Sequence, residues 1–352
     1  MKLPVRILLS LLCIAMIAAM PFVIPTPNMT DEYKGELLEE MEDGEDEFEF
    51  GRLFLSTAMA EDDLEVETLD DDGTESAPEV SDGAFNPVAQ WDLPVDFSVP
   101  PEPNPACYTE NSYEDESVSV RLETVEENGV TWHVAYVKIA SPTQWRTAIA
   151  SAKITGTKTA KVSTLAKNNH AILTFSGDNY VDNPTKTAFE YRQGQKIRAK
   201  KNSKKDNLVV DENGDFHLFL KQEGLKDYKG EIVNAYTFGP ALVIDGSVQT
   251  ADTDYGYNPN GREPRAAIGQ TGALSYVFVI AEGRGESAGA THQELADFMA
   301  GIGCTQAFNL DGGNSAEMVF NGEIYKGQPG ADERSLSDII YICTAVPEEN
   351  WK

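Results

Sequence analysis

The sequence predicts an α+β fold, with a single domain built on a large mixed, largely antiparallel sheet and a few helices. Two observations support this. Short apolar segments with strand-like alternation recur from residue 113 onward, whereas only one stretch has a strong helical period. The strand and helix patterns do not alternate regularly, as they would in a parallel α/β fold. We assign this domain to residues 107–352, which is long enough to bury a sizeable core.

The chain begins with a targeting segment, residues 1–30. Lys2 and Arg6 precede an almost unbroken apolar run over residues 7–24. A helix of this length reaches about 27 Å, close to the roughly 30 Å hydrocarbon core of a bilayer. Since basic residues precede the run and acidic residues follow it, we expect the domain outside the cell membrane, held by a single-pass signal anchor. The alternative is a cleaved signal peptide and a secreted protein.

An acidic and proline-rich tether is expected at residues 31–106. Residues 31–82 hold 22 acidic and two basic residues and so carry −20 of the net charge of −30. Such a segment buries too little apolar surface to offset chain entropy, so we expect disorder. Five prolines between residues 94 and 105 predict a stiff spacer. The acidic balance argues against nucleic acid as a partner and against adsorption to anionic lipid, which leaves the N-terminal segment as the expected membrane contact.

The folded part is expected to begin with a hairpin. Residues 118–122 and 130–139 alternate in the manner of strands, and Asn128-Gly129 is a hairpin turn. Ser141-Pro142 then predicts a helix start, and a short helix is expected to run through Leu165. Further strands are expected at residues 171–175, 189–197, 207–210, 216–220, 241–244, 266–269, 274–281, 306–310, 318–320, 323–325 and 339–343.

One helix is strongly predicted before the strand at residues 306–310. Thr291 and Glu294 form a capping box at its start. Apolar residues then follow with helical spacing and form one stripe, which consists of Leu295, Phe298, Met299 and Ile302.

We expect no cofactor and no metal. The cysteine spacings match no zinc motif, and for Cys304 and Cys343 two buried free thiols are favoured over a disulfide. Asp252, Asp254 and Glu263 have the spacing of calcium-loop ligands, but the glycine that such a loop requires is missing, so an acidic surface loop is favoured. The four histidines lie beside no nucleophile signature and are interpreted as structural or surface residues.

The most informative motif is N-L-D-G-G-N-S at residues 309–315. An expected strand runs into Asp311, which the strand would hold rigidly. Gly312 and Gly313 permit positive φ and the close approach of a ligand to backbone N–H groups. A plain tight turn capped by the aspartate is the alternative.

Other charged residues lie at the ends of neighbouring expected strands, bracketed by glycines. They are Gly177 and Asp178, Arg265, Glu282 and Arg284, and Arg334. Arginine recognises phosphate through bidentate, charge-assisted hydrogen bonds, so the set indicates a pocket for an anionic ligand. Surface ion pairs remain the alternative for any one of these arginines.

With these four blocks in this order, the sequence resembles the phosphodiester glycosidases over residues 113–346. The blocks read S-G-D-N-Y at 176–180, P-R-A-A-I-G at 264–269, E-G-R at 282–284 and N-L-D-G-G-N-S at 309–315. The family removes sugars from phosphodiesters. The chain departs from the family pattern at four positions, where Asn, Thr, Asp and Gly are replaced by Ser176, Ala266, Glu282 and Asn314.

The resemblance implies a hydrolase that cleaves sugar-1-phosphodiesters, in exopolysaccharide or cell-wall polymer. It implies that Asp311 is the nucleophile or base and that Glu282 or Asp178 is the second carboxylate. The implied substrate-binding residues are Arg265, Arg284, Gly177, Asn309, Gly312, Gly313, Ser315 and Arg334. The four departures leave a surface glycan-binding module without catalysis open as an alternative. A structural surface protein with an acidic tether is a third possibility.

Overall fold

The computed structural model describes residues 95–151, 157–178, 189–199, 204–249, 258–326 and 333–351. Every described residue belongs to one compact unit, which spans residues 77–352. The predicted targeting segment at residues 1–30 and most of the predicted tether lie outside the described residues. Within the described ranges, no helix has both the length and the apolar character needed to cross a membrane.

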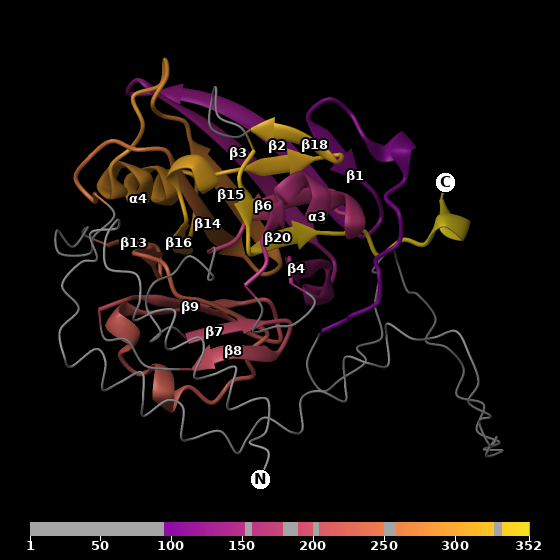
Figure 1. Cartoon of the computed structure of the whole chain (residues 1–352), viewed down its shortest axis with the longest axis horizontal. Coiled ribbons are helices and arrows are strands. Elements are labelled where there is room, and N and C mark those ends of the chain that lie inside the picture. Colours follow the sequence, from indigo (N-terminus) through magenta and orange to yellow (C-terminus); the bar gives the residue numbers. More distant parts are fainter. Residues whose placement is uncertain are drawn as a thin grey trace, which may run out of the picture. The chain divides into compact units, whose positions relative to one another are not determined.

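The largest sheet has eight strands in the order β1-β2-β3-β15-β14-β16-β12-β13 (Figure 1). Its strands are β1 (Ser112–Glu114), β2 (Val118–Glu127), β3 (Val130–Ile139), β12 (Ala241–Ile244), β13 (Ser247–Val248), β14 (Arg265–Gly272), β15 (Ser275–Ala281) and β16 (Gln306–Leu310). The predicted hairpin is confirmed, because β2 pairs with β3 along their whole length around the turn at Asn128 and Gly129.

Two further sheets have five strands each. One has the order β10-β9-β11-β7-β8 and consists of β7 (Phe189–Arg192), β8 (Gln195–Ala199), β9 (Asn207–Val210), β10 (Phe216–Phe219) and β11 (Asn234–Tyr236). The other has the order β18-β17-β6-β20-β4 and consists of β4 (Trp145–Ile149), β6 (Leu173–Ser176), β17 (Met318–Phe320), β18 (Glu323–Lys326) and β20 (Asp338–Ile342). A small fourth sheet pairs β5 (Ala160–Lys161) with β19 (Ser335–Leu336).

The predicted class of antiparallel sheets with few helices is confirmed, but the prediction of one large mixed sheet is wrong. The described strands form four sheets, and all of their pairings are antiparallel. Parallel neighbours need a crossover connection, which is usually a helix. The described residues contain two α-helices, α3 (Val162–Asn168) and α4 (His292–Gly301), which is too few for such crossovers.

The prediction of a helix that begins at Ser141-Pro142 is wrong. Ser141 does cap a turn with a full capping box, but the turn is a single 3-10 turn, Pro142–Gln144. The chain then enters β4, which pairs with β20 nearly 200 residues later. Tertiary strand pairing therefore overrides the local helix signal, and the α-helix begins only at Val162.

The segment predicted as one strand at residues 189–197 is instead a hairpin. β7 and β8 pair with each other around Gln193 and Gly194, which both have positive φ. The other predicted strands are present, with ends shifted by at most a few residues.

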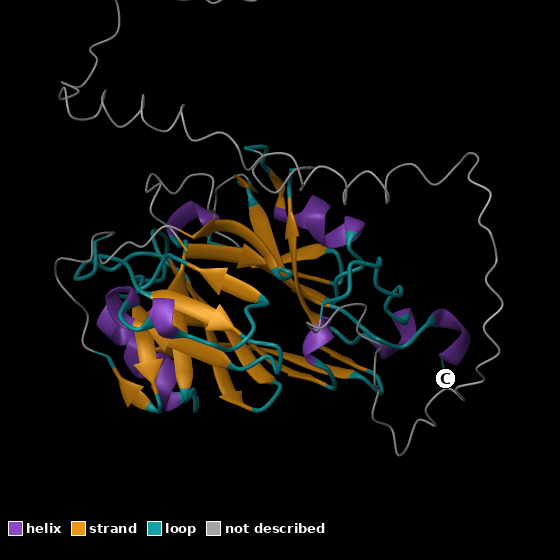
Figure 2. Cartoon of the chain, turned by 90° about the horizontal axis from the view of Figure 1, so that it is seen from below, coloured by secondary structure: helices purple, strands orange, loops and turns teal. Residues whose placement is uncertain are grey.

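One apolar core joins the three large sheets. It includes Ile268 and Phe278 from the eight-stranded sheet, Phe175 and Ile340 from the β6-β20 sheet, and Leu208 from the β9-β11 sheet. α4 packs on the other face of the eight-stranded sheet and α3 on the other face of the β6-β20 sheet. Figure 2 shows the strands in the interior and the helical turns around them.

Residues 95–106, the last part of the predicted tether, lie against the folded part. Val95 is buried, and the guanidinium of buried Arg146 donates to Asp96 and to the Ser98 carbonyl at 3.0 and 2.7 Å. The Nδ1 of His170 lies 2.8 Å from the Pro100 carbonyl. These contacts satisfy polar groups that would otherwise be buried without partners. Residues 95–106, which were assigned to the tether, therefore pack against the described residues that follow them.

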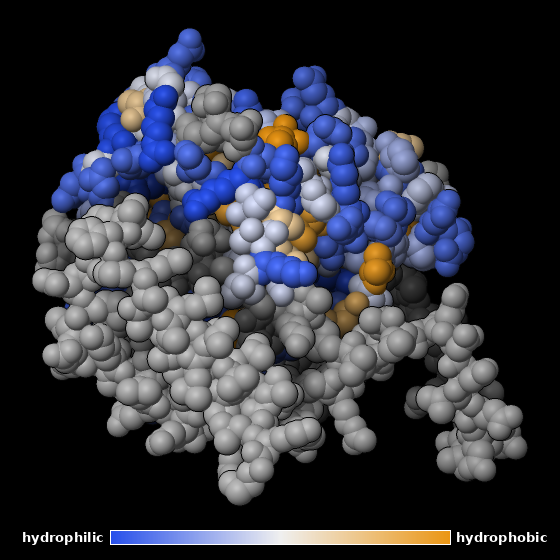
Figure 3. All heavy atoms as spheres, viewed as in Figure 1, coloured by the Kyte–Doolittle hydropathy of each residue, from blue (hydrophilic) through white to orange (hydrophobic). Residues whose placement is uncertain are grey.

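On the face shown in Figure 3, hydrophilic side chains cover most of the described surface and apolar side chains occur singly. Cys304 and Cys343 are free and buried, as expected. Burial raises the pKa of their thiols to about 12 and about 11, so both thiols stay protonated and unreactive at neutral pH.

Candidate functional site

The antiparallel order brings the ends of four neighbouring strands together at one end of the eight-stranded sheet. β14 pairs with β15 and with β16, so Arg265 at its start lies opposite Ala281, and Ala266 lies opposite Leu310. The loops after β15 and β16 therefore emerge beside the start of β14. The beginning of β12 lies at the same end of the sheet, because β12 pairs with β16.

A cavity of about 290 Å³ lies at this end of the sheet. Six of the predicted site residues line it, namely Arg265, Arg284, Asn309, Asp311, Gly312 and Gly313. Phe238, Asn258, Glu263, Pro264 and Leu310 complete the wall. The structure thus brings together residues that are up to 48 positions apart in the predicted set.

The turn after β16 requires both of its glycines. A Cβ on Gly312 would lie 2.6 Å from the Pro264 carbonyl oxygen, and Gly313 has a φ of +58°. The Gly313 N–H donates to that same carbonyl at 2.8 Å, so it is already occupied. The Gly312 N–H has no acceptor among the described residues. Of the two predicted amide donors, only the one on Gly312 can serve a ligand.

Arg284 is held between two loops. Its Nε and Nη2 donate to one carboxylate oxygen of Glu263 at 3.1 and 2.7 Å, and its Nη1 donates to the Asn314 side chain at 3.0 Å. The residue has a φ of +61°, which is uncommon for a side chain of this size and is typical of functional sites. The hydrogen bond from Arg284 is the main reason why the pKa of Glu263 lies below its ordinary value.

Arg265 is a structural anchor of the cavity wall. It is buried, and its guanidinium donates to the carbonyls of Ala290, Asn258 and Gly261 and to the Nε2 of His292. Burial lowers the pKa of Arg265 to about 10, which still leaves the group charged at neutral pH. For His292, burial and the Arg265 charge lower the pKa to about 3, so its neutral ring accepts the hydrogen bond.

Asn309 fixes the wall on the β12 side. Its Nδ2 donates to the Gly239 carbonyl at 2.8 Å, and its own backbone carbonyl accepts from the Gly239 N–H at 3.0 Å. These bonds hold Phe238 in the lining. The Oδ1 of Asn309 is buried and has no hydrogen-bond partner among the described residues.

Glu282, one of the predicted second carboxylates, does not line this cavity. Its Oε1 lies 2.8 Å from the Nε2 of buried His133, whose Nδ1 lies 3.0 Å from the Thr124 hydroxyl. Burial is the main cause of the lowered pKa of His133. The carboxylate that does line the cavity is Glu263, which the sequence suggests only as part of a calcium-loop spacing.

Asp178, the other predicted second carboxylate, also lies outside the cavity lining. It is fully buried and pairs with Arg192 at 2.5 Å, and Arg192 also binds Asp338 at 2.8 Å. Burial raises the pKa of Asp178, with Arg192 opposing the shift and Asp338 adding to it. Gly177 is required here by packing, because a Cβ would lie 2.2 Å from an Asp338 carboxylate oxygen.

Ser315 and Arg334 contact each other rather than the cavity. Nη1 of Arg334 donates to the Ser315 hydroxyl at 2.7 Å. This bond ties the turn that leaves the cavity to the segment that leads into β20. Both residues thus support the position of the Gly312-Gly313 turn.

Lys205 has no sequence signal but lies near the cavity. Its Nζ is 5.8 Å from the centre of the Phe238 ring, and burial lowers its pKa to about 8. Lys205 and Glu263 are the charged residues near the cavity that the motifs did not indicate. They lie in loops, where neither strand period nor turn chemistry predicts a role.

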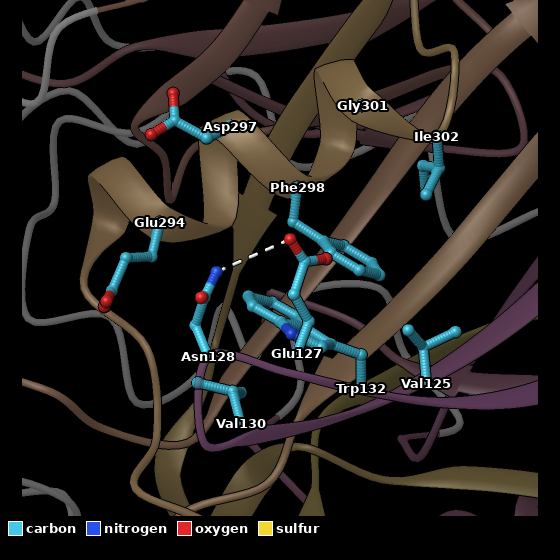
Figure 4. A pocket seen from close by; sticks show the side chains of 10 residues that line it. All are labelled: Val125, Glu127, Asn128, Val130, Trp132, Glu294, Asp297, Phe298, Gly301 and Ile302. Carbon is cyan, nitrogen blue, oxygen red and sulfur yellow. Dashed lines mark hydrogen bonds between the residues drawn. The ribbon is translucent and has the colours of Figure 1, made fainter.

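A second cavity, of about 430 Å³, lies between the β2-β3 hairpin and α4 (Figure 4). Trp132 and Phe298 in its lining stack with their ring centres 4.0 Å apart, and Asn128 donates to Glu127. None of the predicted site residues lines it. In the described ranges, no group of three or more His, Cys, Asp or Glu could hold a metal ion. Asp252 and Asp254 of the calcium-loop spacing lie outside those ranges.

Comparison with known proteins agrees with the motifs. Residues 169–343 match the family profile described as phosphodiester glycosidase, a span that contains the whole cavity lining. Residues 169–343 are therefore similar to the phosphodiester glycosidase family. The resemblance stated from the four sequence blocks is thereby confirmed.

The chain is also similar in fold to solved structures. The catalytic domain of zebrafish N-acetylglucosamine-1-phosphodiester alpha-N-acetylglucosaminidase, auto-inhibited by its pro-peptide, superposes with a TM-score of 0.51 at 16% identity. The match covers 64% of this chain and 83% of that chain, and it shows a shared fold. A hypothetical protein from Synechocystis matches with a TM-score of 0.46 at 15% identity, over 64% of this chain and 62% of that one.

One curated relative is similar in sequence. The SPbeta prophage-derived uncharacterized protein YomE of Bacillus subtilis (strain 168) is 32% identical over 110 residues. That stretch is 31% of this chain, and it spans only 17% of the length of the relative.

Proposed function

We propose that the chain is a glycosidase-type hydrolase that cleaves the bond between the anomeric carbon of a sugar and a phosphodiester. The observation that carries this proposal is one cavity in which Asp311, the Gly312-Gly313 turn and Arg284 meet. The cavity lies within residues 169–343, which are similar to the phosphodiester glycosidase family.

The proposed reaction places most of the demand on anion binding. Water adds to the anomeric carbon, the bond to the phosphate oxygen breaks, and its electron pair leaves with the phosphate, which becomes a monoester. Such a leaving group has a low pKa, so it needs stabilisation of charge more than protonation. Arg284 and the Gly312 N–H supply donors at this position, and Asp311 acts as the nucleophile or as the base toward water.

Glu263, rather than Glu282 or Asp178, lies beside Asp311 in the cavity lining. It is the second acid in the lining, but its ion pair with Arg284 assigns it to orienting the arginine. The bond to a phosphodiester can break without a strong general acid, which fits a site whose second carboxylate is already engaged.

We further propose that this hydrolase acts outside the cell, on a phosphodiester-linked exopolysaccharide or cell-wall polymer. The apolar run at residues 7–24 and the acidic segment at residues 31–82 support export. Mass spectrometry of the mature chain tests how it is held. An intact N-terminus that needs detergent for extraction is expected for a signal anchor, and a chain that begins near residue 20 indicates a secreted protein.

The test of the activity uses the full chain in detergent and a panel of methyl hexosyl-1-phosphodiesters, with release of reducing sugar as the readout. Asp311→Asn is expected to lower kcat by at least about 100-fold, because it removes the nucleophile or base. Its binding of the substrate, measured by calorimetry, should be retained. Asp297→Asn, on the exposed side of α4, is the matched control and should keep wild-type kcat.

Binding of these diesters without any release of sugar would overturn the proposal. That result would favour the glycan-binding module without catalysis.

A further inference from the structure

Asn314 stands where the family pattern has a third glycine, and it contacts Arg284 directly. We infer that Asn314 is a positioning residue, which with Glu263 sets Arg284 to bind a singly charged phosphodiester in preference to a doubly charged phosphomonoester. This inference rests on the proposed function, since it concerns the phosphate side of the same cavity.

Arg284 keeps two N–H donors that its neighbours do not use. A guanidinium has five N–H donors. Three of them donate to Glu263 and Asn314. The two that remain, one on each terminal nitrogen, have no acceptor among the described residues. They form a pair suited to the two non-bridging oxygens of a phosphodiester.

The guanidinium of Arg284 is held close to the turn at Gly312 and Gly313. A Cβ added to Gly313 would lie 3.6 Å from Nη2 and 3.9 Å from Nη1 of Arg284, so both terminal nitrogens lie over the turn that follows Asp311. The Arg284 side chain is 51% exposed, and a long exposed side chain would otherwise sample many rotamers. The Asn314 amide at one end and Glu263 at the other hold the guanidinium at that place.

The charges around Arg284 favour a singly charged ligand. The charged side chains in the lining are Glu263, Arg265, Arg284 and Asp311. Glu263 is ionised, because its hydrogen bond from Arg284 keeps its pKa below the ordinary value. The charge of Arg284 is therefore partly neutralised before any ligand arrives. A phosphomonoester carries a charge of about −1.5 to −2 at pH 7 and costs more to desolvate than a singly charged diester, and a partly neutralised Arg284 offsets less of that cost.

The product of the proposed reaction on the phosphate side is a phosphomonoester. The same arrangement that accepts the substrate should therefore weaken binding of this product. Asn314 is neutral, so it orients Arg284 without adding a second carboxylate that would cancel the remaining attraction.

The experiment compares a methyl hexosyl-1-phosphodiester with the corresponding hexose-1-phosphate on the full chain. Calorimetry in the Asp311→Asn background gives both Kd values at pH 8 and pH 5. At pH 8 the diester should bind about tenfold more tightly, and the ratio should approach one at pH 5, where the monoester loses its second charge. Equal ratios at the two pH values would overturn the inference.

Two substitutions isolate Asn314. Asn314→Asp keeps an acceptor for Arg284 but adds a charge, so KM for the diester should rise about tenfold while kcat stays within about threefold. Asn314→Gly should release Arg284 and reduce the preference for the diester at pH 8. Asn111→Asp, the same change at an exposed asparagine away from the cavity, is the control and should behave as wild type.

The outcomes separate this inference from the proposed function. If no substrate is hydrolysed but the diester preference depends on Asn314, the hydrolase proposal fails and the inference stands. If hydrolysis depends on Asp311 but both Asn314 variants behave like the Asn111→Asp control, the inference alone fails.

Discussion

Glu317 and Glu333 form a pair of buried carboxyl groups near the end of the site motif. Glu317 is 5% exposed, and burial together with the neighbouring Glu333 raises its pKa to about 8. Glu333 accepts hydrogen bonds from the backbone and side chain of Ser163, and its pKa is lowered despite its burial. At neutral pH Glu317 is therefore the protonated member, which donates to Glu333.

The pair predicts how stability depends on pH. Since the folded pKa of Glu317 lies above its ordinary value of 4.5, its contribution to stability is fully present below pH 4.5 and is lost as pH rises toward 8. Glu317→Gln mimics the protonated form and should raise the free energy of unfolding at pH 8 by roughly 2 kcal/mol, with little change at pH 5.

Urea unfolding at the two pH values measures this effect. Glu323→Gln, which changes an exposed carboxylate on the adjacent strand, should show no such difference. If wild type and Glu317→Gln differ equally at pH 5 and pH 8, Glu317 does not hold its proton.

At the scale of elements, α4 follows the rules that its sequence predicts. The Thr291 hydroxyl accepts from the Glu294 N–H at 3.1 Å, and the Glu294 carboxylate accepts from the Thr291 N–H at 2.9 Å. The predicted stripe packs on the eight-stranded sheet. The first residue of the helix, His292, accepts from Arg265, so the cap also fixes one wall of the candidate site.

Removal of this cap should cost about 1 kcal/mol. Thr291→Ala is therefore expected to lower the Tm by roughly 2–4 °C, a shift typical of domains of 150–250 residues. Thr291→Ser keeps the hydroxyl and should retain most of the wild-type Tm. Thr159→Ala, at an exposed threonine outside any cap, serves as the control. Equal losses in the two Thr291 variants would show that the hydroxyl is not what stabilises the helix.

At the scale of the whole described unit, Arg192 joins two sheets. It lies on β7, and its guanidinium binds Asp178 after β6 and Asp338 at the start of β20. It also donates to the Ala235 carbonyl at 2.6 Å and lies 4.3 Å from the centre of the Tyr236 ring. A charge that is buried this completely stabilises a fold only while its partners remain.

Arg192→Met should therefore destabilise the protein by about 3–5 kcal/mol, because it leaves two buried carboxylates without a counter-ion. Adding Asp178→Asn and Asp338→Asn to this variant should recover a large part of the loss. Arg121→Met removes an exposed pair with Glu123 and should cost less than about 1 kcal/mol. Denaturant midpoints report all three variants, and failure of the triple variant to recover would argue against the charge explanation.

The fold was predictable wherever a local signal coincides with the tertiary arrangement. The β2-β3 hairpin and α4 both have such signals, namely a turn dipeptide and a capping box. The helix start predicted at Ser141-Pro142 was wrong, because pairing with β20 stabilises residues 145–149 as a strand more than a cap would stabilise a helix there. The division into several sheets depends on such long-range pairings, which no short window of sequence contains.

For the site, the sequence by itself was enough to identify the residues whose backbone conformation restricts the choice of amino acid. Asp311, Gly312 and Gly313 end a buried strand, and the glycines are required by positive φ or by contact with Pro264, so their pattern is visible locally. Together with the three other motif blocks at expected strand ends, they were also sufficient to indicate the family that residues 169–343 match.

Only the tertiary structure decided which charges face the cavity. Glu282 and Asp178 carry the same motif signal as Arg284, but His133 and Arg192 engage them outside the cavity lining. Arg265 does line the cavity, with its guanidinium engaged by buried carbonyls. Glu263, with no motif of its own, takes a place beside Arg284 instead. The reason is that a charged side chain pairs with whatever groups the packed strands bring within reach, and those groups come from distant parts of the chain.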